Sequence, residues 1–210
     1  DTLTERNPNP YDGEPYYNLG WSCKMQGKMD EAYDAFFKSA WNAAWQDAAY
    51  YALAQIDTAR GKYESALDKV ERSLIRNWHN HKARQLKASI LRKLNRKEEA
   101  LELIRESLKI DRFNMGCRFE HYLLTEDQNL LAEMTGLMRR WEHTFIEYAL
   151  DFGGAGLYDE AILFLESYLS ETRKVYPMIY YALGYFHACR GEKAHALDYY
   201  RKAEKEDHSY

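Results

Sequence analysis

The stretch YYALAQIDTARGKYESALDKV, residues 50–70, carries a pattern that recurs along the chain. Gly61 marks a turn, Ala66 follows it five positions later, and Val70 follows nine positions later. Ala54 stands seven positions before the turn. The same pairing of turn residue and alanine occurs at Gly27/Ala32, Asn95/Ala100, Gly156/Ala161 and Gly191/Ala196. The first three turns are 34 residues apart and the last two are 35 apart, which is the period of a stacked helix–turn–helix repeat.

The residues around the five turns suit two helices that approach closely. The positions seven before each turn are small: Gly20, Ala54, Ala88, Ala149 and Gly184. The positions nine after it are bulky and apolar: Phe36, Val70, Ile104, Leu165 and Tyr200. Glycine and asparagine tolerate the left-handed conformation that ends a helix. We therefore predict antiparallel helical hairpins whose bulky residues fill the space between neighbouring repeats.

This pattern predicts an all-α chain of about six hairpins, placed at 13–44, 47–78, 80–110, 112–138, 141–173 and 176–206. Residues 1–12 are polar, hold two of the four prolines and are predicted to be an extended lead-in. Residues 13–210 are predicted to form a single domain, because no repeat buries its apolar face alone.

The fourth hairpin is predicted to be shortened. Asn95 and Gly156 are 61 residues apart, which is one full period plus 27. FNMGCRFEHYLL and DQNLLAEMTGLMRR fit its two helices but lack the small-residue pattern. The alternative is a local break in the stack. The last helix, KAHALDYYRKAEKEDHSY, is followed by no polar capping helix, so we expect that the natural protein continues or that another chain covers this end.

Composition restricts the class of protein. The 210 residues are 46% hydrophobic and 30% charged, and the net charge of −4 argues against a general nucleic-acid binder. No run of about 18 apolar residues is present, so we expect no membrane partner. The three cysteines, Cys23, Cys117 and Cys189, have no CxxC spacing, and we expect reduced, mostly buried thiols. The chain starts at Asp1 with no visible signal peptide, and we expect a piece of a longer protein, with a cytoplasmic location slightly favoured.

The segments GKMDEAYDAF, GKYESALDKV, RKEEALELI, GLYDEAILFL and GEKAHALDYY resemble the tetratricopeptide repeat (TPR) superfamily over roughly 13–206. This resemblance implies a right-handed helical solenoid. More narrowly, NPYDGEPYYNLGW, SAWNAAWQDAAYYALAQI, EYALDFGGAGLYDEA and PMIYYALGYFHACRGE resemble the C-terminal TPR array of large bacterial proteins. Those proteins carry a β-rich, carbohydrate-related region upstream of the array. The narrower resemblance implies the helical tail of a multidomain bacterial protein of unknown function.

Motifs for catalysis or metal binding are weak. Asp151-Phe152-Gly153 spells a kinase-like triplet, but no phosphate loop accompanies it, so it is interpreted as a helix end before the Gly156 turn. Cys117 and His121 lie four residues apart, and His79/His81 and His187/Cys189 are similar loose pairs. Zinc needs further ligands that the sequence does not place. We expect no enzyme activity, no cofactor and no metal.

A binding surface is the stronger prediction. In TPR-type stacks the first helix of each hairpin lines the concave face, which places aromatic and polar residues there: Tyr17, Trp21, Tyr51, Gln55, Tyr181 and Tyr185. Between Arg72 and Lys97 no acid occurs, and Lys82, Arg92 and Lys93 are expected on the same face. A basic centre between aromatic ends suits an acidic or carboxylate-bearing ligand. The alternatives are that the aromatic residues pack between repeats and that acids of neighbouring helices balance the bases.

The sequence thus favours a protein–protein interaction or scaffold module of a larger bacterial protein. Its partner is expected to be a protein, a peptide or an upstream domain of the same polypeptide. The alternative is a non-catalytic accessory domain of a carbohydrate-active enzyme, which braces a catalytic domain or contacts glycan.

Overall fold

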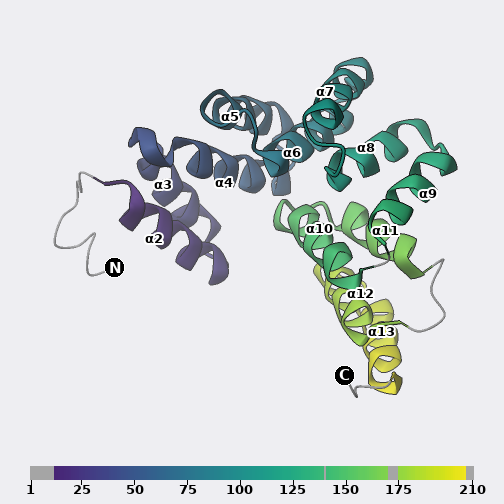
Figure 1. The fold of residues 1–210 in the computed structure, drawn as a ribbon. Helices are drawn as coiled ribbons and strands as arrows, with labels where there is room; N and C mark the ends of the chain where they lie inside the picture. The colour runs from purple at the N-terminus through teal and green to yellow at the C-terminus, as the bar shows by residue number, and fades with distance from the viewer. Residues whose placement is uncertain (1–11, 140, 170–174, 207–210) are drawn as a thin grey trace. The chain divides into compact units, whose positions relative to one another are not determined.

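The computed structural model describes residues 12–139, 141–169 and 175–206, which form twelve α-helices and one short 3₁₀-helix (Figure 1). No strand occurs within these ranges. The helices follow one another as six pairs. They are α2 (Glu14–Met25) and α3 (Met29–Ser39); α4 (Gln46–Ala59) and α5 (Tyr63–Arg76), after the 3₁₀-helix η1 (Ala43–Trp45); α6 (His81–Lys93) and α7 (Lys97–Ile110); α8 (Met115–Thr125) and α9 (Gln128–Leu137); α10 (Glu142–Gly154) and α11 (Tyr158–Leu169); α12 (Pro177–Cys189) and α13 (Lys193–Lys205).

These bounds confirm the predicted hairpins. The predicted lead-in covers residues 1–12. All of them except Asp12 lie outside the described part of the chain. The chain divides into two compact units, Asp1–Leu103 and Ile104–Tyr210, and the boundary falls inside α7. The single domain over 13–210 and the right-handed solenoid concern the arrangement of the whole chain, and both stay predictions.

All five predicted turn residues adopt the left-handed conformation, with φ of 75° at Gly27, 70° at Gly61, 59° at Asn95, 73° at Gly156 and 82° at Gly191. Each turn is closed by the same two backbone hydrogen bonds. In the second hairpin, the Gly61 amide donates to the Thr58 carbonyl at 2.9 Å and the Lys62 amide donates to the Asp57 carbonyl at 2.9 Å. This pair of bonds is the Schellman motif, which satisfies carbonyls that the end of a helix leaves open.

The fourth hairpin closes differently. Glu126, with φ of 57°, is the left-handed residue, and its amide donates a single bond to the Tyr122 carbonyl at 2.7 Å. Asp127 then caps α9, because its carboxylate accepts a hydrogen bond from the Asn129 amide at 2.9 Å. A shortened hairpin of α8 and α9 is therefore confirmed, and its stacking on the third hairpin stays a prediction.

The small residues seven before the turn are required by close helix packing. A Cβ atom on Gly20 would lie 2.7 Å from the Phe36 ring, and one on Gly184 would lie 2.4 Å from the Tyr200 ring. Phe36 and Tyr200 thus pack against the small residue of their own hairpin, because the turn brings the residue seven before it opposite the residue nine after it. Phe36 also lies in a buried cluster with Ala52, Leu53 and Ile56 of α4, so it fills the space between the first two hairpins as expected.

Each unit has its own apolar core. In the first unit, Cys23, Ala32, Phe36, Ala52, Leu53 and Ile56 form a buried cluster. In the second unit, phenylalanine rings gather around Phe164, with ring centroids of Phe119, Phe145 and Phe152 at 4.9, 5.6 and 6.0 Å from it. All three cysteines are free; Cys23 and Cys117 are buried, and Cys189 is exposed. Across the described ranges, no helix combines the length and the apolar character needed to cross a membrane.

Candidate functional site

Four side chains of the first unit meet between α2 and α4, the first helices of the first two hairpins. The Lys24 ammonium donates to the Gln55 side-chain oxygen at 3.0 Å, and the Gln55 side-chain amide donates to the Tyr51 hydroxyl at 3.2 Å. The Lys24 nitrogen also lies 4.8 Å from the centroid of the Trp21 ring. We call Trp21, Lys24, Tyr51 and Gln55 the α2–α4 cluster.

Helix geometry explains why these residues meet. Residues three or four apart share a helix face, so Trp21 lies beside Lys24 on α2 and Tyr51 beside Gln55 on α4. Gln55 is only 5% exposed, whereas Trp21, Lys24 and Tyr51 are partly buried. The buried amide therefore forms the floor of the cluster, and the other three side chains reach the surface.

The environment of Lys24 is electrostatically unusual. Burial lowers the pKa of Lys24 from 10.5 to about 8, so the ammonium is still mostly protonated at neutral pH. Its contacts with Gln55 and Trp21 are an amide oxygen and an aromatic face, both uncharged. A cation in such surroundings attracts anions more strongly than one in water. The arrangement can bind a carboxylate, with Tyr51 and Trp21 beside it.

Sequence reasoning predicted Trp21, Tyr51 and Gln55 but missed Lys24. The signal was available, because Lys24 stands one helical turn after Trp21. Tyr17 and Trp21 both pack against the core of the first unit, because each ring lies 5.6 Å from that of Phe36. The Tyr17 ring also lies 5.0 Å from that of Trp45. The alternative that aromatic residues pack inside the fold therefore applies to part of the surface of both residues.

The predicted basic residues of α6 are spread along that helix. Lys82 is exposed in the first turn, whereas Arg92 and Lys93 are partly buried in the last turn. Lys82 and Lys93 are eleven positions apart, which is about 16 Å along the helix axis. Two other bases of the acid-free stretch pair with acids, since Lys87 lies 2.9 Å from Glu71 and Arg96 lies 2.6 Å from Glu99.

Tyr181 and Tyr185 lie on α12, in the second unit. The Tyr181 ring is 6.2 Å from that of Tyr200. Tyr185 is 53% exposed, and its ring lies edge-on to Phe186 at 5.3 Å. The assignment of Tyr181 and Tyr185 to the predicted concave face stays a prediction.

The kinase-like triplet lies inside α10, as expected. Phe152 is buried in the core of the second unit, and a Cβ atom on Gly153 would lie 2.3 Å from the Phe186 ring. Gly153 therefore lets α10 and α12 approach closely, and Gly156 provides the left-handed turn. Packing thus explains Gly153, and backbone conformation explains Gly156.

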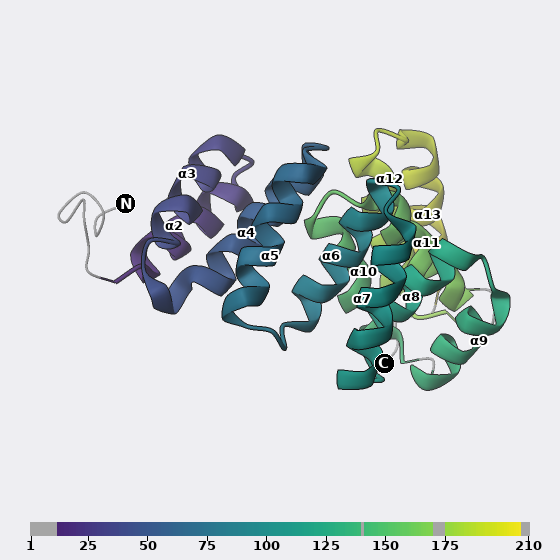
Figure 2. The same cartoon turned by 90° about the horizontal axis from the view of Figure 1, so that it is seen from above.

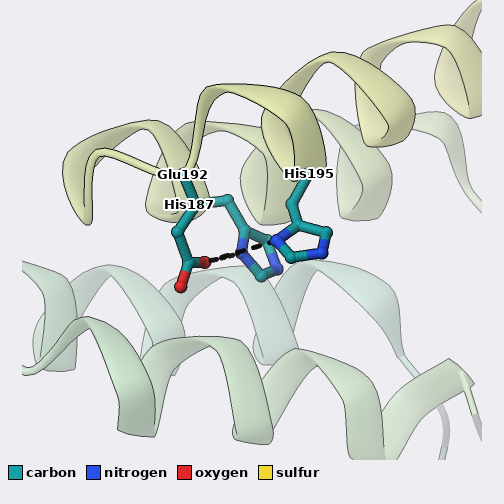
Figure 3. Close-up of side chains that lie close together, drawn as sticks. All are labelled: His187, Glu192 and His195. Carbon is teal, nitrogen blue, oxygen red and sulfur yellow. Dashed lines mark hydrogen bonds and ion pairs between the residues drawn. The ribbon is translucent and has the colours of Figure 1, made fainter.

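A second group of polar side chains gathers at the turn of the sixth hairpin (Figure 3). His187 comes from the end of α12, Glu192 from the turn and His195 from the first turn of α13. The Glu192 carboxylate lies 2.6 Å from His187 Nδ1 and 3.8 Å from His195 Nδ1. The hydrogen bond from His187 lowers the pKa of Glu192. Sequence reasoning considered His187 with Cys189 and missed this group, because its contacts cross the turn.

The comparisons with known proteins agree with this fold. Residues 51–114, the second and third hairpins, match the family model of the tetratricopeptide repeat. The structure is similar to a tetratricopeptide repeat protein from Parabacteroides merdae, with a TM-score of 0.62 and 20% identity, over 99% of this chain and 84% of that chain. The fold class is therefore that of the tetratricopeptide repeat proteins.

Two further solved structures are similar. One is pilF of Pseudomonas aeruginosa, with a TM-score of 0.54 and 14% identity, over 92% of this chain and 90% of that chain. The other is YrrB, described as a TPR protein with an unusual peptide-binding site, with a TM-score of 0.50 and 17% identity, over 96% of this chain and 89% of that chain. No curated protein matches the sequence.

Proposed function

We propose that this chain is a protein-interaction module that binds an acidic or carboxylate-ended peptide at the α2–α4 cluster. The observation that carries the proposal is the position of Lys24, whose ammonium lies between the Trp21 ring and the Gln55 side chain. A peptide carboxylate would form an ion pair with this cation. The Trp21 and Tyr51 rings would supply apolar contact, as aromatic anchors commonly do at interfaces.

The fold supports the same proposal. Stacked helical hairpins present the first helix of each pair to a ligand, and peptide binding by YrrB is an instance on a similar fold. Lys82, Arg92 and Lys93 on α6 extend the proposed surface within the first unit, and Tyr181 and Tyr185 on α12 are separate candidates in the second unit. The role within a larger bacterial protein belongs to the proposal as well.

A peptide-binding experiment tests this function. A library of acidic peptides, each made with a free C-terminal carboxylate and with a C-terminal amide, is screened against the full chain by fluorescence polarisation. Lys24→Met keeps the length of the side chain and removes the charge. Because hydrogen bonds to charged groups contribute about 1.5–3 kcal/mol, we expect this variant to lose roughly tenfold or more in affinity. Binding should also weaken as salt rises.

Lys28→Met is the matched control, because Lys28 is an exposed lysine of the same hairpin, at the start of α3. It should bind like the wild type. Equal binding by wild type and Lys24→Met would show that the α2–α4 cluster is not the site. Binding to a glycan array, with no peptide binding, would instead favour the carbohydrate-related accessory domain.

A further inference from the structure

We propose that His187, Glu192 and His195 form a binding site for a divalent transition-metal ion of the zinc type, at the turn of the sixth hairpin.

The repeat itself brings the two imidazoles together. His187 stands four residues before the turn residue Gly191, and His195 stands four after it. The same two positions meet in other hairpins: the Cys23 sulfur donates to the Glu31 carboxylate at 3.9 Å, and the Ser65 hydroxyl donates to the Asp57 carboxylate at 2.8 Å. The backbone of a Schellman turn thus imposes the proximity of His187 and His195, whose ring centroids lie 5.4 Å apart.

The third ligand follows from the same turn. The Glu192 amide donates to the His187 carbonyl at 2.9 Å, which fixes its backbone beside α12. Its carboxylate reaches both imidazoles, and one ligand atom from each of the three residues lies within 4.8 Å of the others. Two ligands of a tetrahedral zinc ion lie about 3.3 Å apart. The 2.6 and 3.8 Å separations lie on either side of this value, so small side-chain rotations would accommodate an ion.

Surrounding contacts orient two of the ligands. Arg190 binds the other carboxylate oxygen of Glu192 at 3.1 Å and lies 3.0 Å from Asp159 on α11. One oxygen of Glu192 is thereby kept toward the histidines. The His187 ring stacks on Tyr199, with centroids 5.2 Å apart and 17° between planes. His187 is 8% exposed, and its Nε2 is buried without a hydrogen-bond partner among the described residues. The contacts that Arg190 and Tyr199 make are of the kind that orients ligands in metal sites.

The donor set selects the class of ion. Two imidazole nitrogens and one carboxylate oxygen suit zinc and its neighbours cobalt, nickel and copper. Magnesium and calcium prefer oxygen ligands throughout. Three protein ligands leave a fourth position for water or for a side chain of a binding partner. The exposed side of the site, where the His195 side chain is 68% exposed, gives the ion access.

The test uses the full chain without an affinity tag and zinc chloride as the probe. Isothermal titration calorimetry should show one zinc ion per chain, and magnesium chloride should give no binding. His195→Ala and Glu192→Gln should each lower zinc affinity by about tenfold or more. His195 is exposed, so its removal should leave the helical circular dichroism spectrum intact. Zinc should also shift the imidazole nitrogen signals of His187 and His195 in NMR spectra.

Two control variants address other sources of zinc binding. His81→Ala removes an exposed histidine of the first unit, and Cys189→Ser removes the exposed thiol two residues from His187. Both should bind zinc as the wild type does. The proposal is overturned if the wild type binds no zinc at micromolar concentration, if the ligand variants bind it equally well, or if Cys189→Ser alone abolishes binding.

Discussion

The second and the sixth hairpins share one turn and use it differently. In Figure 2 α4 and α5 run side by side, and in Figure 1 α12 and α13 do the same. The residue four before the turn is Asp57 in the second hairpin and His187 in the sixth, and each contacts side chains from beyond the turn. The backbone therefore determines which positions meet, and the side chains there determine what the contact can do.

At the second turn the polar side chains are largely shielded from solvent and satisfy one another. Asp57 is 2% exposed and accepts hydrogen bonds from the Ser65 hydroxyl at 2.8 Å and the Tyr33 hydroxyl at 3.3 Å. Lys69 lies 3.1 Å from the same carboxylate oxygen. Burial acts to lower the pKa of Lys69, but the hydrogen bonds to Tyr33 and Asp57 outweigh it, and the pKa is raised. The second turn thus holds a satisfied ion pair, whereas the sixth turn holds the three side chains proposed to bind a metal ion, His187, Glu192 and His195.

The largest expected effect on stability comes from removing the Asp57 carboxylate at the second turn. Asp57→Ala leaves the partly buried Lys69 without its carboxylate and the Tyr33 and Ser65 hydroxyls without their acceptor, and removal of one partner of a buried pair costs up to about 3–5 kcal/mol. Urea denaturation followed by circular dichroism measures this loss. Asp68→Ala is the control, because Asp68 pairs with Arg72 at the surface of the same helix, and surface pairs contribute about 0–1 kcal/mol. Equal losses of unfolding free energy in Asp57→Ala and Asp68→Ala would contradict a stabilising role for the contacts of Asp57.

The next effect tests close packing in the sixth hairpin. Gly184→Ala places a methyl group 2.4 Å from the Tyr200 ring, and overpacking of this kind costs roughly 1–3 kcal/mol. Gly136→Ala in α9 is the control, since a Cβ atom there meets nothing within 4 Å. An added methyl at such a site stabilises a helix by about 0.4–1 kcal/mol. Thermal unfolding should separate the two variants in opposite directions, and a Gly184→Ala midpoint at or above wild type would disprove the close approach.

Sequence predicted the hairpins well because their determinants are local. Gly27, Gly61 and Asn95 indicate the turns. The small and bulky residues then stand at fixed positions before and after each turn. The shortened hairpin required only the count of residues between two turns. Its left-handed residue was not predictable by type, because Glu126 is an uncommon choice for positive φ.

The candidate sites were harder to predict because their contacts join separate helices. Tyr51 and Gln55 could be assigned to one face of one helix, but Lys24 joins them from α2 across the space between hairpins. His187 and His195 belong to different helices of one hairpin, and only the register of the turn brings them together. That register is itself readable from the repeat, since the positions four before and four after each turn residue recur along the chain.

The smallest effect concerns Lys24, which contacts the Gln55 side chain and the Trp21 ring. Its pKa is lowered by burial to about 8 in the folded protein, against 10.5 for an exposed lysine. Between these two values the unfolded chain binds more protons than the folded one, so the free energy of unfolding rises with pH. Below pH 8 the cost of the buried charge is fully present.

Lys24→Met should therefore be more stable than wild type at pH 7, by on the order of 1 kcal/mol. The difference should shrink as pH rises from 8 to 10.5. Urea denaturation at pH 7, 8.5 and 10 measures it, with Lys28→Met as the control whose difference from wild type stays constant. If the difference in unfolding free energy between Lys24→Met and wild type stays constant with pH, Lys24 is solvated in the folded protein. The proposed carboxylate site would then lose its support.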